Sequence, residues 1–217
     1  MRAGALELIY VNRYLGGYAS IRKALGSFLR RRLPGPVHIL DLGAGVSDVG
    51  AHLVEWGDRH GVDVRVMAVE GNPALVREGA RWLDDRLPER IRHRVQQVTA
   101  DVWNLSASEA RCDVAIAALF LHHLNSEQGI ELLRRMSTFA RDGIVVSDLH
   151  RHGLAYHGIR LAGWAFRASP VFRHDGPISV QRGFKRAELA GMAEEAGLTH
   201  TRIRWNWAFR WTLSTVE

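Results

Sequence analysis

Four residues of this sequence have side chains that could move a proton. His122 and His123 lie in the stretch FLHHL, and Asp148 and His150 lie in the stretch SDLHRH. An imidazole takes a proton near neutral pH, and a carboxylate beside it can orient the ring. We therefore treat all four as candidate catalytic residues, with a histidine as the base and Asp148 as its orienting partner. In a structural alternative, one of the two adjacent histidines packs beneath its loop and caps the next helix.

Further acidic residues flank a glycine-rich loop in the stretch ILDLGAGVSDVG. Gly43 and Gly45 allow a backbone to pass close to a ligand, but Asp48 stands where a dinucleotide-binding loop has its third glycine. Asp41 and Asp48 also bring negative charge to a helix start that would otherwise attract a pyrophosphate. The loop therefore favours a ligand with a positive ammonium or sulfonium group, and it disfavours an NAD-dependent oxidoreductase.

Two more carboxylates follow later apolar runs. Glu70 ends the run VRVMAVE, where it could accept hydrogen bonds from both hydroxyls of a ribose. Asp101 follows the run VQQVTA, where it could read the exocyclic amine of an adenine. The combined pattern describes an adenosine without phosphate that carries a cationic group. S-adenosylmethionine has these properties.

The elements that would position these residues alternate between strand and helix patterns. Strand patterns occur in VHILDLG, VRVMAVEG, VQQVTADV, CDVAIAAL and GIVVSDL. Helix starts between them are predicted at Ser47-Asp48, Asn72-Pro73 and Ser126, and Gly61 ends the first of these helices. Such alternation predicts a doubly wound α/β fold with a largely parallel sheet. Ligands of such sheets bind beyond the carboxyl ends of the strands.

The two ends of the chain and one insertion depart from this alternation. Residues 6–32 have the pattern of one or two helices, and 185–196 have that of a final helix ended by Gly197. An insertion over 150–183 contains an amphipathic stretch at 154–168, and the remainder, RHDGPISVQRG, is polar and rich in turn residues.

Large apolar residues alternate in the last segment of the chain. A period of two predicts a closing β-hairpin with a bend near Asn206, its tryptophans packed in the core. The alternating residues are Ile203, Trp205, Trp207, Phe209 and Trp211.

In order and spacing, the motifs DLGAG, VEGN, TADV and CDVAIAALFLHHL resemble those of class I S-adenosylmethionine-dependent methyltransferases. The resemblance is strong over 37–149 and looser over 184–216. It implies one methyltransferase domain over 1–217, with a Rossmann-like seven-stranded sheet of order 3-2-1-4-5-7-6 and an antiparallel seventh strand. It also implies an N-terminal helical cap over 1–36 and a lid over 150–183.

By the same resemblance, the cofactor is S-adenosylmethionine. The glycine loop would line its methionine part, Glu70 its ribose, and Asp101 with Val102 its adenine. Arg13 would pair with its carboxylate, unless it is simply a surface arginine. Many members of the family have glycine where this chain has Ser47. The candidate cofactor-binding residues are Arg13, Asp41, Gly43, Ala44, Gly45, Glu70, Gly71, Asn72, Asp101, Val102 and Ala118.

The residues after the fourth strand pattern narrow the choice of acceptor. Enzymes that methylate exocyclic or amide nitrogens often carry an Asn/Asp-Pro-Pro-aromatic turn there, but this chain has the apolar sequence ALFL over 118–121. Oxygen is therefore favoured over carbon as the methylated atom. Aromatic residues in 10–18 and 150–183 indicate a small hydrophobic or aromatic acceptor, although the stretch 154–168 could instead only pack on the sheet.

The net charge of +6 and the pI near 10.2 raise nucleic acid as a partner. The arginines are scattered, however, and the one dense cluster, Arg30–Arg32, closes a predicted helix where cations are favourable. We therefore expect a small-molecule substrate and a monomer or homodimer. An N- or C-methyltransferase, including one directed at RNA, and a non-catalytic S-adenosylmethionine-binding protein remain open alternatives.

Other features concern compartment and metals. A single cysteine, Cys112, excludes a disulfide within the chain and fits a reducing compartment. The sequence has no signal-peptide pattern and no apolar run of about 18 residues, so we expect a cytoplasmic protein without a transmembrane segment. No acidic or histidine cluster has the spacing of a metal site, so no metal is predicted.

Overall fold

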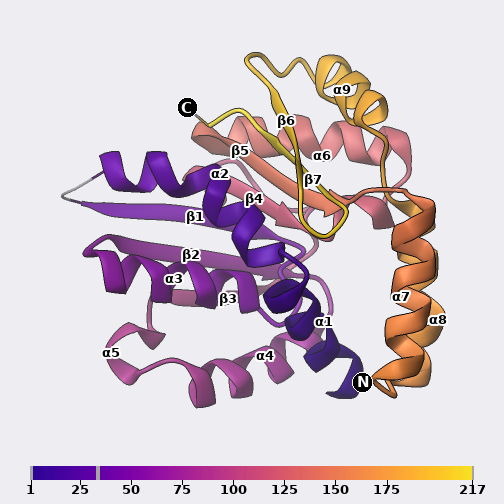
Figure 1. The fold of residues 1–217 in the computed structure, drawn as a ribbon. Coiled ribbons are helices and arrows are strands. Elements are labelled where there is room, and N and C mark those ends of the chain that lie inside the picture. Colours follow the sequence, from indigo (N-terminus) through magenta and orange to yellow (C-terminus); the bar gives the residue numbers. More distant parts are fainter. Residues whose placement is uncertain (1, 33–34, 217) are drawn as a thin grey trace.

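The computed structural model describes residues 2–32 and 35–216, and these contain one sheet of seven strands (Figure 1). The strand order is β3-β2-β1-β4-β5-β7-β6, and β7 runs antiparallel to both of its neighbours. The predicted sheet order and the antiparallel seventh strand are therefore confirmed. The strands are β1 (Pro36–Leu42), β2 (Asp63–Glu70), β3 (Val95–Thr99), β4 (Cys112–Ala118), β5 (Ala140–Leu149), β6 (Arg202–Asn206) and β7 (Arg210–Ser214).

Helices connect the strands and cover both faces of the sheet (Figure 1). No helix in the described ranges is long and apolar enough to cross a membrane. The helices are α1 (Arg2–Tyr14), α2 (Gly17–Arg31), α3 (Asp48–His60), α4 (Pro73–Arg86), α5 (Glu89–Arg92), the 3-10 turn η1 (Leu121–His123), α6 (Ser126–Phe139), α7 (Gly153–Ala165), α8 (Pro170–Arg182) and α9 (Arg186–Glu195).

Alternating strand side chains build two hydrophobic cores, one on each face of the sheet. In β1, Ile39 packs with α2 and α3, whereas its neighbour Leu40 packs with α6 and α9. In β4, Ile116 and Ala117 divide between the same two cores. The sheet is thus buried on both sides, as expected for a parallel arrangement.

Helix starts follow the local sequence signals with one small shift. Asn72 caps α4 by accepting a hydrogen bond from the backbone of Ala74, and Gly61 ends α3 in the left-handed conformation, both as predicted. Helix α6 is capped by Asn125 rather than by Ser126. The reason is a capping box, in which the side chains and backbones of Asn125 and Gln128 bond reciprocally.

The insertion over 150–183 folds into a helical hairpin of α7 and α8 at one side of the molecule (Figure 1). The prediction of a turn-rich second half was wrong, because that part is helix α8. Ser169 caps α8 by accepting a hydrogen bond from the backbone of Phe172, and Pro170 occupies its first turn. A Cβ atom on Gly176 would lie 3.3 Å from Ile159, so packing against α7 holds the helix despite Gly176 and Pro177.

The closing hairpin of β6 and β7 forms as predicted, with Asn206 at the end of β6. The expected core packing of its tryptophans is wrong for two of them, since Trp205 is 48% and Trp207 is 68% exposed. Strand β6 is the edge of the sheet and Trp207 lies in the connection after it, so the alternation marks a strand without burying every large residue.

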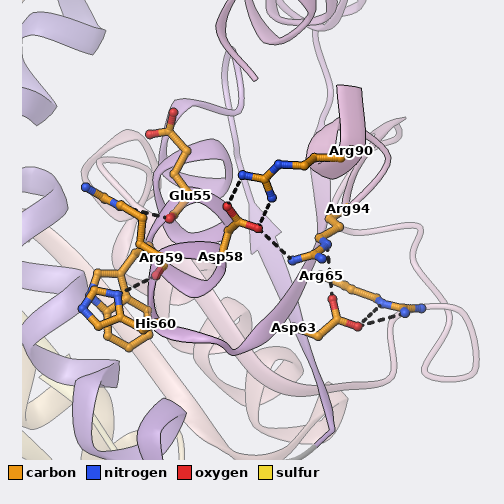
Figure 2. A network of polar contacts seen from close by, with 9 residues as sticks. Glu55, Asp58, Arg59, His60, Asp63, Arg65, Arg90 and Arg94 are labelled. Carbon is orange, nitrogen blue, oxygen red and sulfur yellow. Dashed lines mark hydrogen bonds and ion pairs between the residues drawn. The ribbon is translucent and has the colours of Figure 1, made fainter. Parts of the chain in front are cut away.

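Ion pairs on the surface link α3, β2 and α5 near the amino ends of the strands (Figure 2). Arg90 donates to Asp58 at 2.6 Å, and Arg94 lies 4.0 Å from Asp58 and 3.4 Å from Asp63. Arg65 donates to Asp63 at 3.0 Å. This surface network holds the C-terminal end of α3 at the end of the sheet opposite to the predicted ligand site.

Candidate functional site

The glycine loop leaves β1 at the carboxyl edge of the sheet. Gly43 and Gly45 have φ angles of +68° and +56°, which side chains other than glycine adopt with strain. A Cβ atom on Gly43 would also lie 2.4 Å from the ring of Phe120, whereas one on Gly45 would meet nothing within 4 Å. The loop therefore packs against the chain that follows β4 and leaves open space beside Gly45, where a ligand can approach the backbone.

Ser47 is explained by the backbone that it must adopt. Its φ angle is +64° at the start of α3, a conformation that glycine enters without strain. This explains why a glycine, which the family resemblance implies at this position, would suit the backbone here. In this chain the Ser47 hydroxyl accepts a hydrogen bond of 3.0 Å from the side chain of Gln97, which helps to hold the strained residue.

Glu70 joins the glycine loop to the start of α4. One of its carboxylate oxygens accepts from the backbone of Gly45 at 2.9 Å, and the other accepts from the backbone of Asn72 at 2.8 Å. Each oxygen keeps a second lone pair for a further donor. The carboxylate is therefore held in place at the end of β2, as contact with a ribose would require.

Asp101 follows the neighbouring strand β3. Its side chain is exposed and accepts a hydrogen bond of 3.0 Å from the backbone of Trp103, while Val102 is buried beside it. The backbone of Ala100 donates to the carbonyl of Glu70 at 3.2 Å, so the two predicted acidic positions lie on adjoining strand ends.

Asp41 has a buried carboxylate that no other described group of the protein satisfies. It is fully buried, and neither carboxylate oxygen has a hydrogen-bond partner within the described part of the chain. Burial, together with the charges of Asp48 and Glu70, raises the pKa of Asp41 well above its ordinary value. A positively charged ligand would reverse that shift, and this fits the ammonium of a methionine moiety.

Asp48, predicted only as a negative charge at the start of the helix, has partners within the protein. Its carboxylate accepts hydrogen bonds of 2.9 Å from the amide of Asn12 and 2.9 Å from the hydroxyl of Tyr18, and it is buried. Burial raises the pKa of Asp48, while these two hydrogen bonds act in the opposite direction. Instead of facing a ligand, Asp48 anchors the N-terminal helices to α3.

Sequence reasoning missed Arg210, a fully buried arginine in β7. It donates to the carbonyl of Leu15 at 2.9 Å and to the side chain of Asn12 at 3.3 Å. Burial lowers the pKa of Arg210 to about 10, against the opposing effect of Asp148 and Asp48. Arginines alternate along this hairpin, so no local signal distinguished the one that points inward.

The structure brings His122 and Asp148 together as predicted. The Nδ1 atom of His122 lies 2.7 Å from the carboxylate of Asp148, and the backbone N–H of His122 donates to its other oxygen at 3.1 Å. Both side chains are buried. Burial acts to raise the pKa of Asp148, but the charge and hydrogen bonds of His122 outweigh it and lower the pKa below its ordinary value. The carboxylate is therefore ionised at neutral pH.

The other two candidate catalytic histidines lie apart from this hydrogen bond. The ring of His123 is 4.1 Å from that of His122, and burial and His122 lower its pKa. His150 packs instead against Trp211, with ring centroids 4.9 Å apart. Its Nδ1 atom is buried without a partner among the described residues, so the structure does not bring it to Asp148.

The remaining predicted cofactor-binding residues make no contact that supports or contradicts a role in binding the cofactor. Arg13 is exposed, and its guanidinium lies 5.6 Å from the ring centre of Tyr14. Ala44 donates its backbone N–H to the carbonyl of Val69 at 3.0 Å, which fixes the loop on β2. Gly71 is exposed after β2, and Ala118 ends β4 at the same edge of the sheet.

A family model described as a methyltransferase domain matches residues 39–143, from β1 into β5, and thus contains the glycine loop, Glu70, Asp101 and His122. The sheet order with its antiparallel seventh strand agrees with that match. The match covers just under half of the chain, and together with the sheet it supports a class I S-adenosylmethionine-dependent methyltransferase.

Solved structures of other methyltransferases share this fold. The magnesium protoporphyrin IX methyltransferase of Synechocystis PCC 6803, with bound S-adenosylhomocysteine, superimposes with a TM-score of 0.65 at 14% identity, over 97% of this chain and 91% of the other. The plantazolicin methyltransferase, also in complex with S-adenosylhomocysteine, gives 0.63 at 16% identity, over 94% and 77%. At these identities the likeness concerns the fold.

One curated relative is similar in sequence. The carboxy-S-adenosyl-L-methionine synthase of Psychrobacter arcticus is 26% identical over 152 residues, which cover 65% of this methyltransferase and 55% of the relative. The match thus spans little more than half of the relative's length.

Proposed function

We propose that this chain binds S-adenosylmethionine and transfers its methyl group to an oxygen atom of a small hydrophobic or aromatic acceptor. The observation that carries the proposal is the buried hydrogen bond of 2.7 Å between His122 and Asp148. It lies after β4, where Phe120 packs against the glycine loop. Such a base would lie close to the loop that lines the cofactor, at one edge of the sheet.

The residues at this edge fit the parts of the cofactor. Asp41 offers a buried carboxylate without a partner among the described residues, which suits the ammonium group. Glu70 offers oxygens fixed by two backbone amides to the ribose, and Asp101 with Val102 offers an acceptor and an apolar wall to the adenine. When bound, S-adenosylmethionine supplies a methyl group activated by its sulfonium.

His122 would act as the general base. A neutral ring whose Nδ1–H donates to Asp148 would leave Nε2 free to take a proton from an acceptor hydroxyl. Asp148 holds the tautomer and stabilises the positive ring that forms after the proton is taken. A hydroxyl needs such help more than an amine does, which supports oxygen as the methylated atom.

The walls for the acceptor would come from the helices outside the common sheet. Helix α8 packs on η1. Two charged residues of α8 act on the pKa of His123, which Arg182 lowers and Asp175 raises. Tyr18 of α2 is half-buried beside Asp48. We infer one catalytic domain over 1–217, in which 1–36 acts as a cap and 150–183 as a lid.

Calorimetry with S-adenosylhomocysteine tests the cofactor part of the proposal. Native protein should bind the ligand, and Glu70→Ala should weaken binding by about 1–3 kcal/mol through the loss of a charged hydrogen-bond acceptor. Glu89→Ala, at an exposed position in α5, serves as a matched control that should bind normally. Absence of binding to the native protein would refute the proposal.

Release of S-adenosylhomocysteine from S-adenosylmethionine tests the acceptor part. A panel of phenols should support turnover, whereas the matching anilines should not. Turnover with the anilines alone would reject oxygen as the target atom. Normal cofactor binding without turnover on any acceptor of the panel would instead indicate a non-catalytic binding protein.

A further inference from the structure

The α7–α8 hairpin exposes large apolar side chains to solvent. Five of them, in α7, the turn after it and the start of α8, are between 58% and 83% exposed. A soluble protein rarely leaves so many large side chains together on its surface unless they contact a partner. The five residues, which we call the hairpin face, are Leu154, Leu161, Trp164, Phe166 and Val171.

The inner side of the hairpin is packed, so this exposure is not a sign of a loose segment. Gly163, Pro177 and Val180 are buried between α7, α8 and the body of the domain. Leu154, Leu161 and Trp164 follow each other at helical spacings of seven and three, which places them on one side of α7. Helix α7 thus has an exposed apolar side, and Phe166 and Val171 add exposed apolar side chains in the turn after it and at the start of α8.

The same segment is strongly basic. Over 150–183 it contains the single acidic residue Asp175 and five arginines. Arg151 pairs with Glu188 of α9, but no ion pair involves Arg160 or Arg173 within the described ranges. The five arginines are Arg151, Arg160, Arg167, Arg173 and Arg182.

We propose that the hairpin face docks on the surface of an anionic lipid bilayer. Helices that lie in a membrane interface combine Trp, Phe and Leu on one side with basic residues beside them. Helix α7 contributes Leu154, Leu161, Trp164 and the basic Arg160, and Phe166 follows as its C-cap residue. It contains 13 residues, too few to cross a bilayer, so it lies on the membrane rather than in it. A second copy of this chain is the poorer occupant, because two strongly basic faces would repel each other.

The hairpin is joined to the N-terminal helix at its tip. Ser169 donates its backbone N–H and its hydroxyl to the carboxylate of Glu7 in α1, at 2.5 and 2.6 Å. Tyr10 and Tyr14 of α1 are themselves more than half exposed. A docked hairpin would therefore hold α1 at the bilayer surface as well. The docking stands on the hairpin alone and does not depend on methyl transfer.

Co-sedimentation of the full chain with large unilamellar vesicles tests the proposal. Vesicles of phosphatidylcholine with about one third phosphatidylglycerol should carry the protein down, and pure phosphatidylcholine vesicles should carry down far less. Trp164→Ser combined with Phe166→Ser should lower the partition coefficient about tenfold or more. Arg160→Gln combined with Arg173→Gln should lower it about 25-fold, because each arginine near an anionic surface contributes about fivefold.

A matched control separates the hairpin from the net charge of the chain. Arg77→Gln combined with Arg81→Gln removes two exposed arginines from α4 and should leave vesicle binding almost unchanged. An equal loss of vesicle binding in the two double arginine variants would overturn the proposal, since binding would then follow the overall charge of the chain. So would the absence of vesicle binding, or a dimer in light scattering that Trp164→Ser with Phe166→Ser dissociates. Circular dichroism should show that all variants remain folded.

Discussion

Two polar networks lie at opposite ends of the same sheet. Both consist of aspartates and arginines, but one is at the surface in contact with solvent and the other is buried. The surface network of Figure 2 surrounds the partly exposed carboxylates Asp58 and Asp63, and the exposed Arg65 and Arg90 bring their pairs into contact with water and salt, which screen them. The buried network contains Asp48, Asp148 and Arg210 at the end where the candidate site lies. Removing one member of a buried set leaves an uncompensated charge, so the two ends should respond very differently to the same kind of substitution.

The largest effect is expected at His122. His122→Gln removes the base while Asp148 stays in place, and kcat should fall about 100- to 10,000-fold with little change in cofactor affinity. His123→Gln is the matched control, because His123 makes no described hydrogen bond to Asp148, and its kcat should fall much less. A greater loss in the control would assign the base to His123 instead. Steady-state release of S-adenosylhomocysteine measures both.

Arg210 should carry the largest effect on stability. Arg210→Met leaves Asp48 and Asp148 buried without their nearby positive charge, and the free energy of unfolding should drop by about 3–5 kcal/mol. Arg204→Met, at an exposed position in the adjoining strand β6, should change it little. Urea unfolding followed by circular dichroism compares the two. Equal stability of both variants would show that burial does not distinguish these arginines.

A smaller effect should link pH to cofactor binding through Asp41. The free protein has a raised pKa at Asp41, and a cationic ligand would lower it, so binding should release a proton. The affinity for S-adenosylhomocysteine should therefore increase as the pH rises above the ordinary pKa of an aspartate, for as long as the amino group of the ligand stays protonated. Asp41→Asn should remove this dependence, whereas Asp101→Asn should keep it. Calorimetry in two buffers of different ionisation enthalpy measures the released proton.

The surface network should show the smallest effect of all. Arg90→Ala breaks its pair with Asp58, yet the urea midpoint should differ from that of the native protein by less than Arg210→Met shifts it, and the difference should shrink in high salt. A loss as large as that of the buried variant, and insensitive to salt, would contradict the comparison.

The sequence predicted the parts of the fold that depend on local patterns. Alternating strand and helix signals placed β1 to β5 and their helices, and Asn72 and Gly61 marked helix ends correctly, because capping acts within one turn. Helix α8 was missed because Gly176 and Pro177 disfavour a helix in isolation. Its helical form depends on packing against α7, which no local pattern reveals.

The candidate site divides in the same way. The pairing of His122 with Asp148 was predictable because β4 and β5 are neighbours whose carboxyl ends meet at one edge. The partners of Asp48 were not predictable, because Asn12 and Tyr18 come from helices before the sheet and their approach depends on how those helices pack. The sequence therefore indicated only the charge that Asp48 brings to the start of α3, and not the two side chains that bind it.

The hydrogen bond between Arg210 and Asn12 also bears on how the protein folds during synthesis. Its two residues lie 198 positions apart, which makes it among the most non-local contacts that the chain could form. Helix α1, which carries Asn12, precedes the sheet in the sequence, and its bond to Asp48 can form early, but its bond to Arg210 cannot form before β7 has been synthesised. Until then, Asp48 lacks the nearby cation that the finished fold provides. We therefore expect the contact between α1 and β7 to form last during folding, after the central strands have already paired.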